Sequence, residues 1–121
     1  MADSGTLATT AQVILAIGEY AAADQILIDN TNIWILMAES EMEVEAGNGV
    51  GLVANYASIT ASYKQWLALV ASQRAAFYAI NQNPNAWALA TAQSKLNVIN
   101  DIWQDFKKKI KDKDVIDSMG L

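Results

Sequence analysis

The segment AESEMEVEAG, residues 38–47, holds the side chains with the clearest capacity for chemistry in this chain. A glutamate occupies every second position: Glu39, Glu41, Glu43 and Glu45. Carboxylates bind hard divalent cations, accept hydrogen bonds and pair with lysine or arginine. Three roles stay open for this cluster: a metal site, a contact for cations of another chain or of the basic fourth helix of the same chain, or a solvated helix end.

Most other groups that catalysis uses are missing from the sequence. The chain has no histidine and no cysteine, which removes the commonest general base, the commonest metal ligand and any thiolate. The glycine-rich stretch GNGVG, residues 47–51, lacks the strand before it and the lysine after it that a phosphate-binding loop requires. We therefore expect no enzyme activity and no cofactor, and we assign no residue as a metal ligand.

A helix explains the alternating glutamates better than a strand does. Alanine and glutamate favour helices over strands. Apolar residues of the same region, with one serine between them, follow one another at the helical steps of four, three and four: Ile33, Met37, Ser40 and Val44. In a helix the glutamates form two like-charged pairs on two sides, and each pair costs about 0.2–0.5 kcal/mol.

The composition of the rest of the chain also favours helices. Glycine and proline are scarce, six and one, and good helix formers are plentiful. We predict helices over about 7–19, 22–46, 53–81 and 86–113. The one proline lies in the clearest loop, NQNPNA, and Trp87 just after it is the tryptophan that we expect at an interface. The predicted fold is all-α, a bundle of about four helices, three of them long, in one domain (1–121) with short arms at 1–6 and 114–121.

Local residues predict the helix ends. Thr6, Thr9 and Thr10 are the candidate N-caps of the first helix. Poor helix formers at 29–32 can divide the second helix into two pieces, and Gly47 can end it. The expected apolar face of the third helix comprises Tyr56, Ile59, Tyr63, Trp66, Leu67, Val70, Phe77 and Tyr78. That of the fourth comprises Leu96, Ile99, Ile102, Trp103, Phe106 and Ile110.

The chain is richer in apolar residues than an average domain. Hydrophobic residues make up 53% and charged residues 17%, against about 45–50% and about 25% in typical domains. The segment IWILMA, residues 33–38, is apolar around the whole helix, a pattern typical of burial on all sides. We expect one face, carrying Trp34, Ile35 or Met42, to contact another subunit. The alternative is a central core helix.

Charge divides sharply along the chain. Residues 1–63 contain eight acids and no base, whereas residues 64–121 contain eight bases and five acids, so the halves carry −8 and +3. Such a split suits head-to-tail neighbours or an acidic surface that docks on a basic one. A chance distribution in a short chain is the alternative.

The basic feature is FKKKIKDK, residues 106–113. Its lysines either complement the helix dipole or dock on an acidic partner, and the candidates are Lys107, Lys108, Lys109 and Lys111. The segment is short and alternates with acids in an acidic protein, so we do not expect direct binding to nucleic acid. In the arm that follows, Met119 and Leu121 are the residues that we expect at an interface.

Two stretches together resemble a known family. DNTNIWILMAESEMEVEAG, residues 29–47, and YKQWLALVASQRAAFYAI, residues 63–80, are similar to head–tail connector (adaptor) proteins of tailed bacteriophages and cover roughly a third of the chain. In that family an early helix of the form apolar–apolar–x–Ala–Glu–x–x–apolar–Glu often ends at a glycine, and a helix rich in Leu, Val and Ala follows. The resemblance implies a structural virion protein, a ring-forming subunit between portal and tail, with the segment after Lys107 as its docking arm.

The expected partners are therefore copies of the chain together with portal and tail proteins, in the neck of the virion. The alternative is a soluble all-helical protein-binding module, a cytoplasmic chaperone or regulator that uses an exposed apolar helix face. We expect no membrane partner, because the longest apolar run has six residues. MADSGTLATT has neither the basic nor the apolar region of a signal peptide.

Overall fold

The computed structural model describes residues 5–17, 28–47, 50–82 and 89–120. All regular elements in these ranges are helical, which confirms the predicted all-α bundle of about four helices, three of them long. They are α1 (Thr10–Ile17), α2 (Ile28–Ala46), a 3₁₀ helix (Tyr56–Ser58), α3 (Ala61–Gln82), α4 (Leu89–Ile110) and α5 (Lys113–Met119). Trp87 and Leu121, both predicted interface residues, lie outside the described ranges, as does most of the NQNPNA loop.

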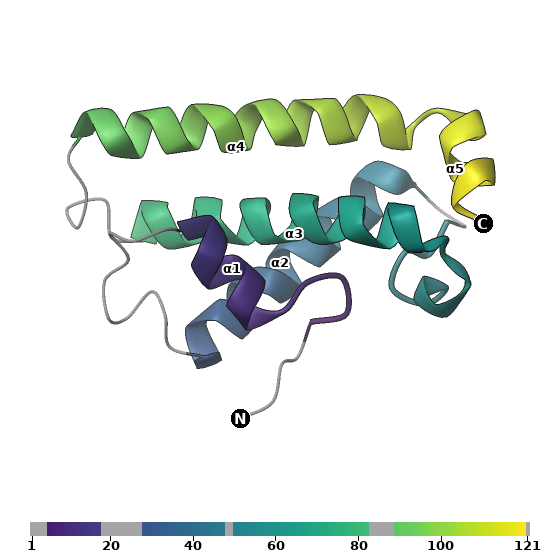
Figure 1. Ribbon diagram of the computed structural model, residues 1–121, viewed down its shortest axis with the longest axis horizontal. Coiled ribbons are helices and arrows are strands. Elements are labelled where there is room, and N and C mark those ends of the chain that lie inside the picture. Colours follow the sequence, from purple (N-terminus) through teal and green to yellow (C-terminus); the bar gives the residue numbers. More distant parts are fainter. Residues whose placement is uncertain (1–4, 18–27, 48–49, 83–88, 121) are drawn as a thin grey trace.

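Helix α3 is the centre of the bundle, because α1, α2 and α4 all pack against it. In Figure 1, α4 runs antiparallel to α3, α2 crosses behind α3, and α1 lies in front. Helix α5 turns back at the end of α4 toward the loop that precedes α3 (Figure 1). Three neighbouring helices therefore pack around one central helix.

The residues that α3 turns toward its neighbours are small. Ala71, Ala75, Ala76 and Ala79 are completely buried, and small side chains at a contact let helix axes approach closely. Of the aromatic residues that the sequence placed on this face, Tyr63, Trp66, Phe77 and Tyr78 are only partly buried, whereas Leu67 and Val70 are in the core. The expected face of α4 is correct, because Ile99, Trp103, Phe106 and Ile110 are all buried.

The buried side chains form two clusters. One, near the C-terminal end of α4, joins Phe106, Ile110 and Met119 to residues of the loop before α3. The other joins α1 to the first half of α2 and the second half of α3. Within the first cluster, Trp103 and Phe106 stack with ring centroids 5.3 Å apart.

Two predicted helix ends are confirmed. The Thr9 hydroxyl accepts a hydrogen bond from the Gln12 amide, and the Gln12 side chain accepts one from the Thr9 amide, at 3.2 and 2.8 Å. This reciprocal pair is a capping box at the start of α1. At the end of α2, Gly47 adopts φ +88° and its amide donates to the Glu43 carbonyl at 3.1 Å, as a left-handed helix end requires.

Three predicted boundaries are wrong. The residues at 29–32 do not divide α2, which is continuous from Ile28 to Ala46; Thr31 and Asn32 are buried in it, so tertiary packing overrides their poor propensity. The third helix begins at Ala61 rather than near 53, because Gly51 adopts φ +63° and Ile59 is extended. The fourth helix ends at Ile110, where a separate helix is initiated by Asp112.

The segment predicted as a C-terminal arm is folded onto the bundle as far as the structure describes it. The Asp112 carboxylate caps α5 by accepting from the Asp114 amide, and Gly120 ends the helix at φ +95°. The Thr60 amide donates to the Met119 carbonyl at 2.9 Å, and the Met119 side chain is fully buried. The segment packs on the bundle because α5 carries apolar side chains, of which Met119 is buried in the core.

Candidate functional site

Each of the four alternating glutamates contacts a different part of its own chain. The sequence placed Glu39 and Glu43 on one side of the helix and Glu41 and Glu45 on the other. In the structure the first pair accepts hydrogen bonds from backbone amides and the second pair meets basic side chains. The repulsion expected within each pair is thus offset by tertiary contacts.

Glu39 holds the segment that precedes α1. Its Oε2 atom accepts hydrogen bonds from the amides of Thr6 and Leu7, at 2.7 and 2.6 Å. The residue is 4% exposed, and burial raises the pKa of Glu39 above its ordinary value of 4.5, although the amide bonds act in the opposite direction. Gly5 has no room for a side chain, since a Cβ there would collide with Ile35. Glu39 is therefore an anchor for the N-terminal segment.

Glu41 forms the best-shielded ion pair among the described residues. Both Nε and Nη2 of Arg74 donate hydrogen bonds to Glu41 Oε2, at 3.1 and 2.8 Å. The Arg74 side chain is 16% exposed and the Glu41 side chain is 30% exposed. The guanidinium also lies 4.4 Å from the Phe77 ring centroid and 4.6 Å from that of Trp103. Arg74, which interrupts the apolar pattern of α3, thus links α2, α3 and α4.

The remaining two glutamates hold loops and helix ends. Glu43 Oε1 accepts from the Val53 amide at 2.7 Å, which fixes the turn after α2. Glu45 lies 3.5 Å from Lys111, a residue of the basic segment, in a mostly exposed pair. Within the described part of the chain, no three acidic, histidine or cysteine side chains gather as a metal site would require. The cluster acts in this structure as a set of internal ties.

The outer face of α2 is apolar and exposed. Its side chains, here called the α2 stripe, are Ile33, Leu36, Met37, Ser40 and Val44. The four apolar members are 55%, 45%, 43% and 79% exposed. Shallow hollows along the stripe are also lined by Glu41, Glu45 and, from α3, Tyr78. Such a contiguous apolar row on a helix is a mark of an interaction surface.

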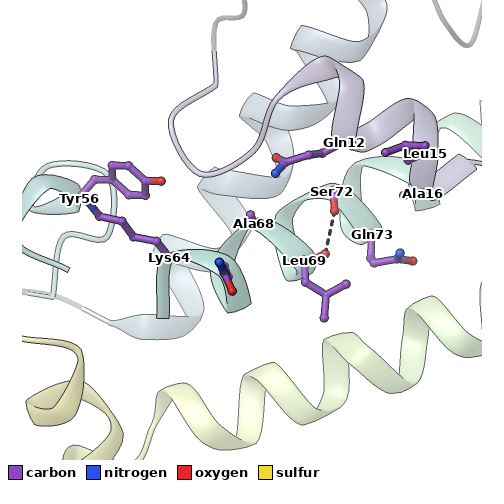
Figure 2. A pocket seen from close by; sticks show the side chains of 10 residues that line it. Gln12, Leu15, Ala16, Tyr56, Lys64, Ala68, Leu69, Ser72 and Gln73 are labelled. Atoms are coloured by element: carbon purple, nitrogen blue, oxygen red, sulfur yellow. Dashed lines mark hydrogen bonds between the residues drawn. The ribbon is translucent and has the colours of Figure 1, made fainter. Parts of the chain in front are cut away.

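A second exposed apolar surface lies between α1, α3 and α4. Two hollows of about 490 and 330 Å³ share Leu15, Ala16 and Gln73 and so form one groove, here called the α3 groove. Figure 2 shows its larger part, with Leu15 and Ala16 of α1 beside Gln73 and Leu69 of α3. Three of its side chains are large, apolar and exposed: Leu15, Leu69 and Val98, at 80%, 46% and 57%.

Two lysines border this groove. Lys64 lies 4.7 Å from the centroid of the Tyr56 ring, at one end. Lys95 lies at the other end, where its ammonium donates to the Ala16 carbonyl at 3.4 Å. The described lining contains no carboxylate. The groove therefore combines apolar walls with positive charge, which the sequence alone does not predict because the lining residues come from elements far apart in the chain.

The predicted apolar contact residues of α2 are on the inner side of the helix. Trp34, Ile35 and Met42 are 8%, 0% and 0% exposed, so the chain encloses them itself. The exposed apolar face of the helix is instead the α2 stripe, which is offset by roughly half a turn. Since the sequence is apolar around this whole segment, its pattern could not distinguish the inner face from the outer one.

The basic segment remains largely on the surface. Lys108 and Lys109 are exposed, Lys107 is partly buried, and Lys109 pairs with Asp105 at 3.0 Å within α4. Lys107–Lys109 fall in the last turn of α4, where they complement the helix dipole. Met119, a predicted contact residue, is buried in the core.

Comparisons of the chain with protein-family models, with curated proteins and with solved structures found no match. No helix in the described ranges has the length and apolar character needed to cross a membrane.

Proposed function

We propose that this chain is a structural subunit that works by assembling with copies of itself. The observation that carries the proposal is the α2 stripe, which leaves four large apolar side chains of one helix exposed. Burial of apolar surface drives association. The four glutamates of α2, which are the described side chains with the clearest capacity for chemistry, are engaged in contacts within their own chain.

The kind of assembly that fits best is a ring-shaped head–tail connector between the portal and tail of a tailed bacteriophage. The two stretches that resemble this family, residues 29–47 and 63–80, form α2 and most of α3. These helices carry the α2 stripe and one wall of the α3 groove. Further contacts with portal and tail proteins, in the neck of a virion, are part of the same proposal.

The test is the mass of the full chain in solution, measured by multi-angle light scattering over a range of concentrations at low and moderate salt. We expect species that are multiples of the 13.1 kDa subunit and that grow with concentration. A subunit that stays monomeric at every concentration would contradict self-assembly. A stable monomer that binds one helical peptide would support the alternative, a helical protein-binding module.

A further inference from the structure

The two exposed apolar surfaces lie on opposite sides of the central helix. Leu69 of α3 lines the α3 groove, and Tyr78 of α3 borders the α2 stripe. The two residues are nine positions apart, and at about 100° per residue this places them on opposite faces of the helix. Figure 1 agrees, with α2 behind α3 and α1 in front of it. One copy can therefore present both surfaces at once to two different neighbours.

The charged side chains that line the two surfaces differ in sign, although the two acids of the α2 stripe already pair with Arg74 and Lys111 of their own chain. The described residues that line the hollows of the α2 stripe include Glu41 and Glu45 and no basic side chain. Those that line the α3 groove include Lys64 and Lys95 and no acidic side chain. Contact between two copies of the stripe would bring like charges together, whereas contact between stripe and groove would bring opposite charges together.

The dimensions of the two surfaces also agree. The α2 stripe extends eleven positions, from Ile33 to Val44, or about 16 Å at 1.5 Å per residue. On α3, the groove extends nine positions, from Lys64 to Gln73, or about 14 Å by the same rise. The stripe is a convex helix face, and a groove between helices is the shape that receives one.

We infer that the α2 stripe of one copy docks into the α3 groove of the next copy, in a head-to-tail contact. The inference rests on the proposed self-assembly and specifies its interface. Since the two contacting surfaces differ, the contact repeats from copy to copy, and it closes into a ring or continues as a filament. A contact between like surfaces would instead stop at a dimer.

The experiment uses two full-length variants that each block one surface. Met37→Lys places a positive charge on the stripe, and Leu69→Glu places a negative charge in the groove. Both positions are 43–46% exposed, so neither change opens a cavity in the core. Ile33→Lys and Val98→Glu repeat the test on the same two surfaces. Val53→Lys is the matched control, an exposed apolar residue that lies on neither surface.

Light scattering and circular dichroism are measured for each variant alone and for an equimolar mixture. Alone, Met37→Lys and Leu69→Glu should each remain folded and monomeric, with association weakened at least about tenfold, as expected for loss of a central contact residue. In the mixture, the intact stripe of Leu69→Glu meets the intact groove of Met37→Lys, and the introduced lysine and glutamate can also pair across a second contact, so association should be restored to at least a dimer. Val53→Lys should assemble as the unmodified chain does.

Several results would overturn the inference while leaving self-assembly in place. If Leu69→Glu and Val98→Glu assemble normally while the stripe variants do not, the stripe pairs with another surface. If all four variants assemble normally, neither surface is used. A mixture that stays monomeric would also exclude the head-to-tail contact. An unmodified chain that is monomeric at all concentrations would exclude both the inference and the proposed function.

Discussion

Replacing Arg74 with methionine tests whether the split of charge along the sequence is used inside the fold. Arg74 donates two hydrogen bonds to Glu41 Oε2 at 3.1 and 2.8 Å, and its side chain is 16% exposed. Its guanidinium also lies within 4.4–5.6 Å of the ring centroids of Phe77, Trp103 and Tyr78. Methionine retains a similar apolar length and a favourable sulfur–ring contact, so the change removes mainly the charge.

The magnitude follows from these contacts. Hydrogen bonds to a charged group contribute about 1.5–3 kcal/mol, and a cation over an aromatic ring adds about 0.5–1 kcal/mol when partly exposed. Without Arg74, Glu41 would keep a charge whose Oε1 atom is already buried without a hydrogen-bond partner among the described residues. The Glu41 side chain is 30% exposed, and solvent screening lowers the sum. We expect Arg74→Met to lower the free energy of unfolding by about 2–3 kcal/mol.

Urea denaturation followed by circular dichroism at pH 7 measures this loss. A double-mutant cycle with Glu41→Gln should give a coupling energy of about 1–2 kcal/mol, since the two residues contact each other directly. Lys109→Met is the control: its partner Asp105 is 3.0 Å away but both side chains are about half exposed, and the expected cost is below about 0.5 kcal/mol. A coupling no larger than that of the control would refute the reasoning.

Three further predictions concern the anchored ends of the bundle. Burial raises the pKa of Glu39, so the contribution of its protonated form to stability is complete below pH 4.5 and is lost as the pH rises through the raised pKa. In urea titrations, the unmodified chain should therefore lose stability over that pH range relative to the Glu39→Gln variant. Parallel pH profiles of the two proteins would contradict this. Met119→Ala should cost about 2–5 kcal/mol, because the side chain is fully buried, whereas the exposed control Ser118→Ala should cost little; equal melting temperatures for the two variants would show that α5 is not docked. Thr9→Ala should cost about 0.5–2 kcal/mol by removing the cap of α1, and an unchanged melting temperature would exclude the capping box.

The features of the fold that were predictable are those set by local chemistry. The all-α class, the cap at Thr9 and the end of α2 at Gly47 depend on residues within one helical turn of each other. The short helix α5 also carried local signals, an aspartate cap at Asp112 and a glycine at its end. Its apolar residues are too few to show periodicity, so the sequence does not predict that this segment packs on the core.

The features that were not predictable depend on distant residues. Glu41 and Arg74 are 33 positions apart, as are Glu39 and Thr6, and no local sequence pattern predicts either contact. The inner and outer faces of α2 are decided by where α3 lies, since the helix is apolar on both. The α3 groove combines residues from α1, α3 and α4, so it exists only after the bundle has formed.

The position of α2 in the bundle explains why its glutamates alternate along the sequence. Steps of two residues turn about 200° around a helix, so alternate glutamates emerge on its two flanks, between the buried face and the α2 stripe. One flank holds Thr6, Leu7 and Val53 through backbone amides, and the other meets Arg74 and Lys111. The acidic half of the chain is thus tied partly to its own basic half.

This internal use of charge limits what charge can do between copies. Since Glu41 and Glu45 already have basic partners in their own chain, the lysines of a neighbouring groove would meet a partly neutralised flank in the proposed contact. The contact should therefore derive most of its strength from apolar burial, and charge should chiefly orient the encounter. Raising the salt concentration should slow assembly more than it shortens the lifetime of the assembled form, as light-scattering kinetics can measure. Assemblies that dissociate completely at moderate salt would show instead that ion pairs between copies dominate.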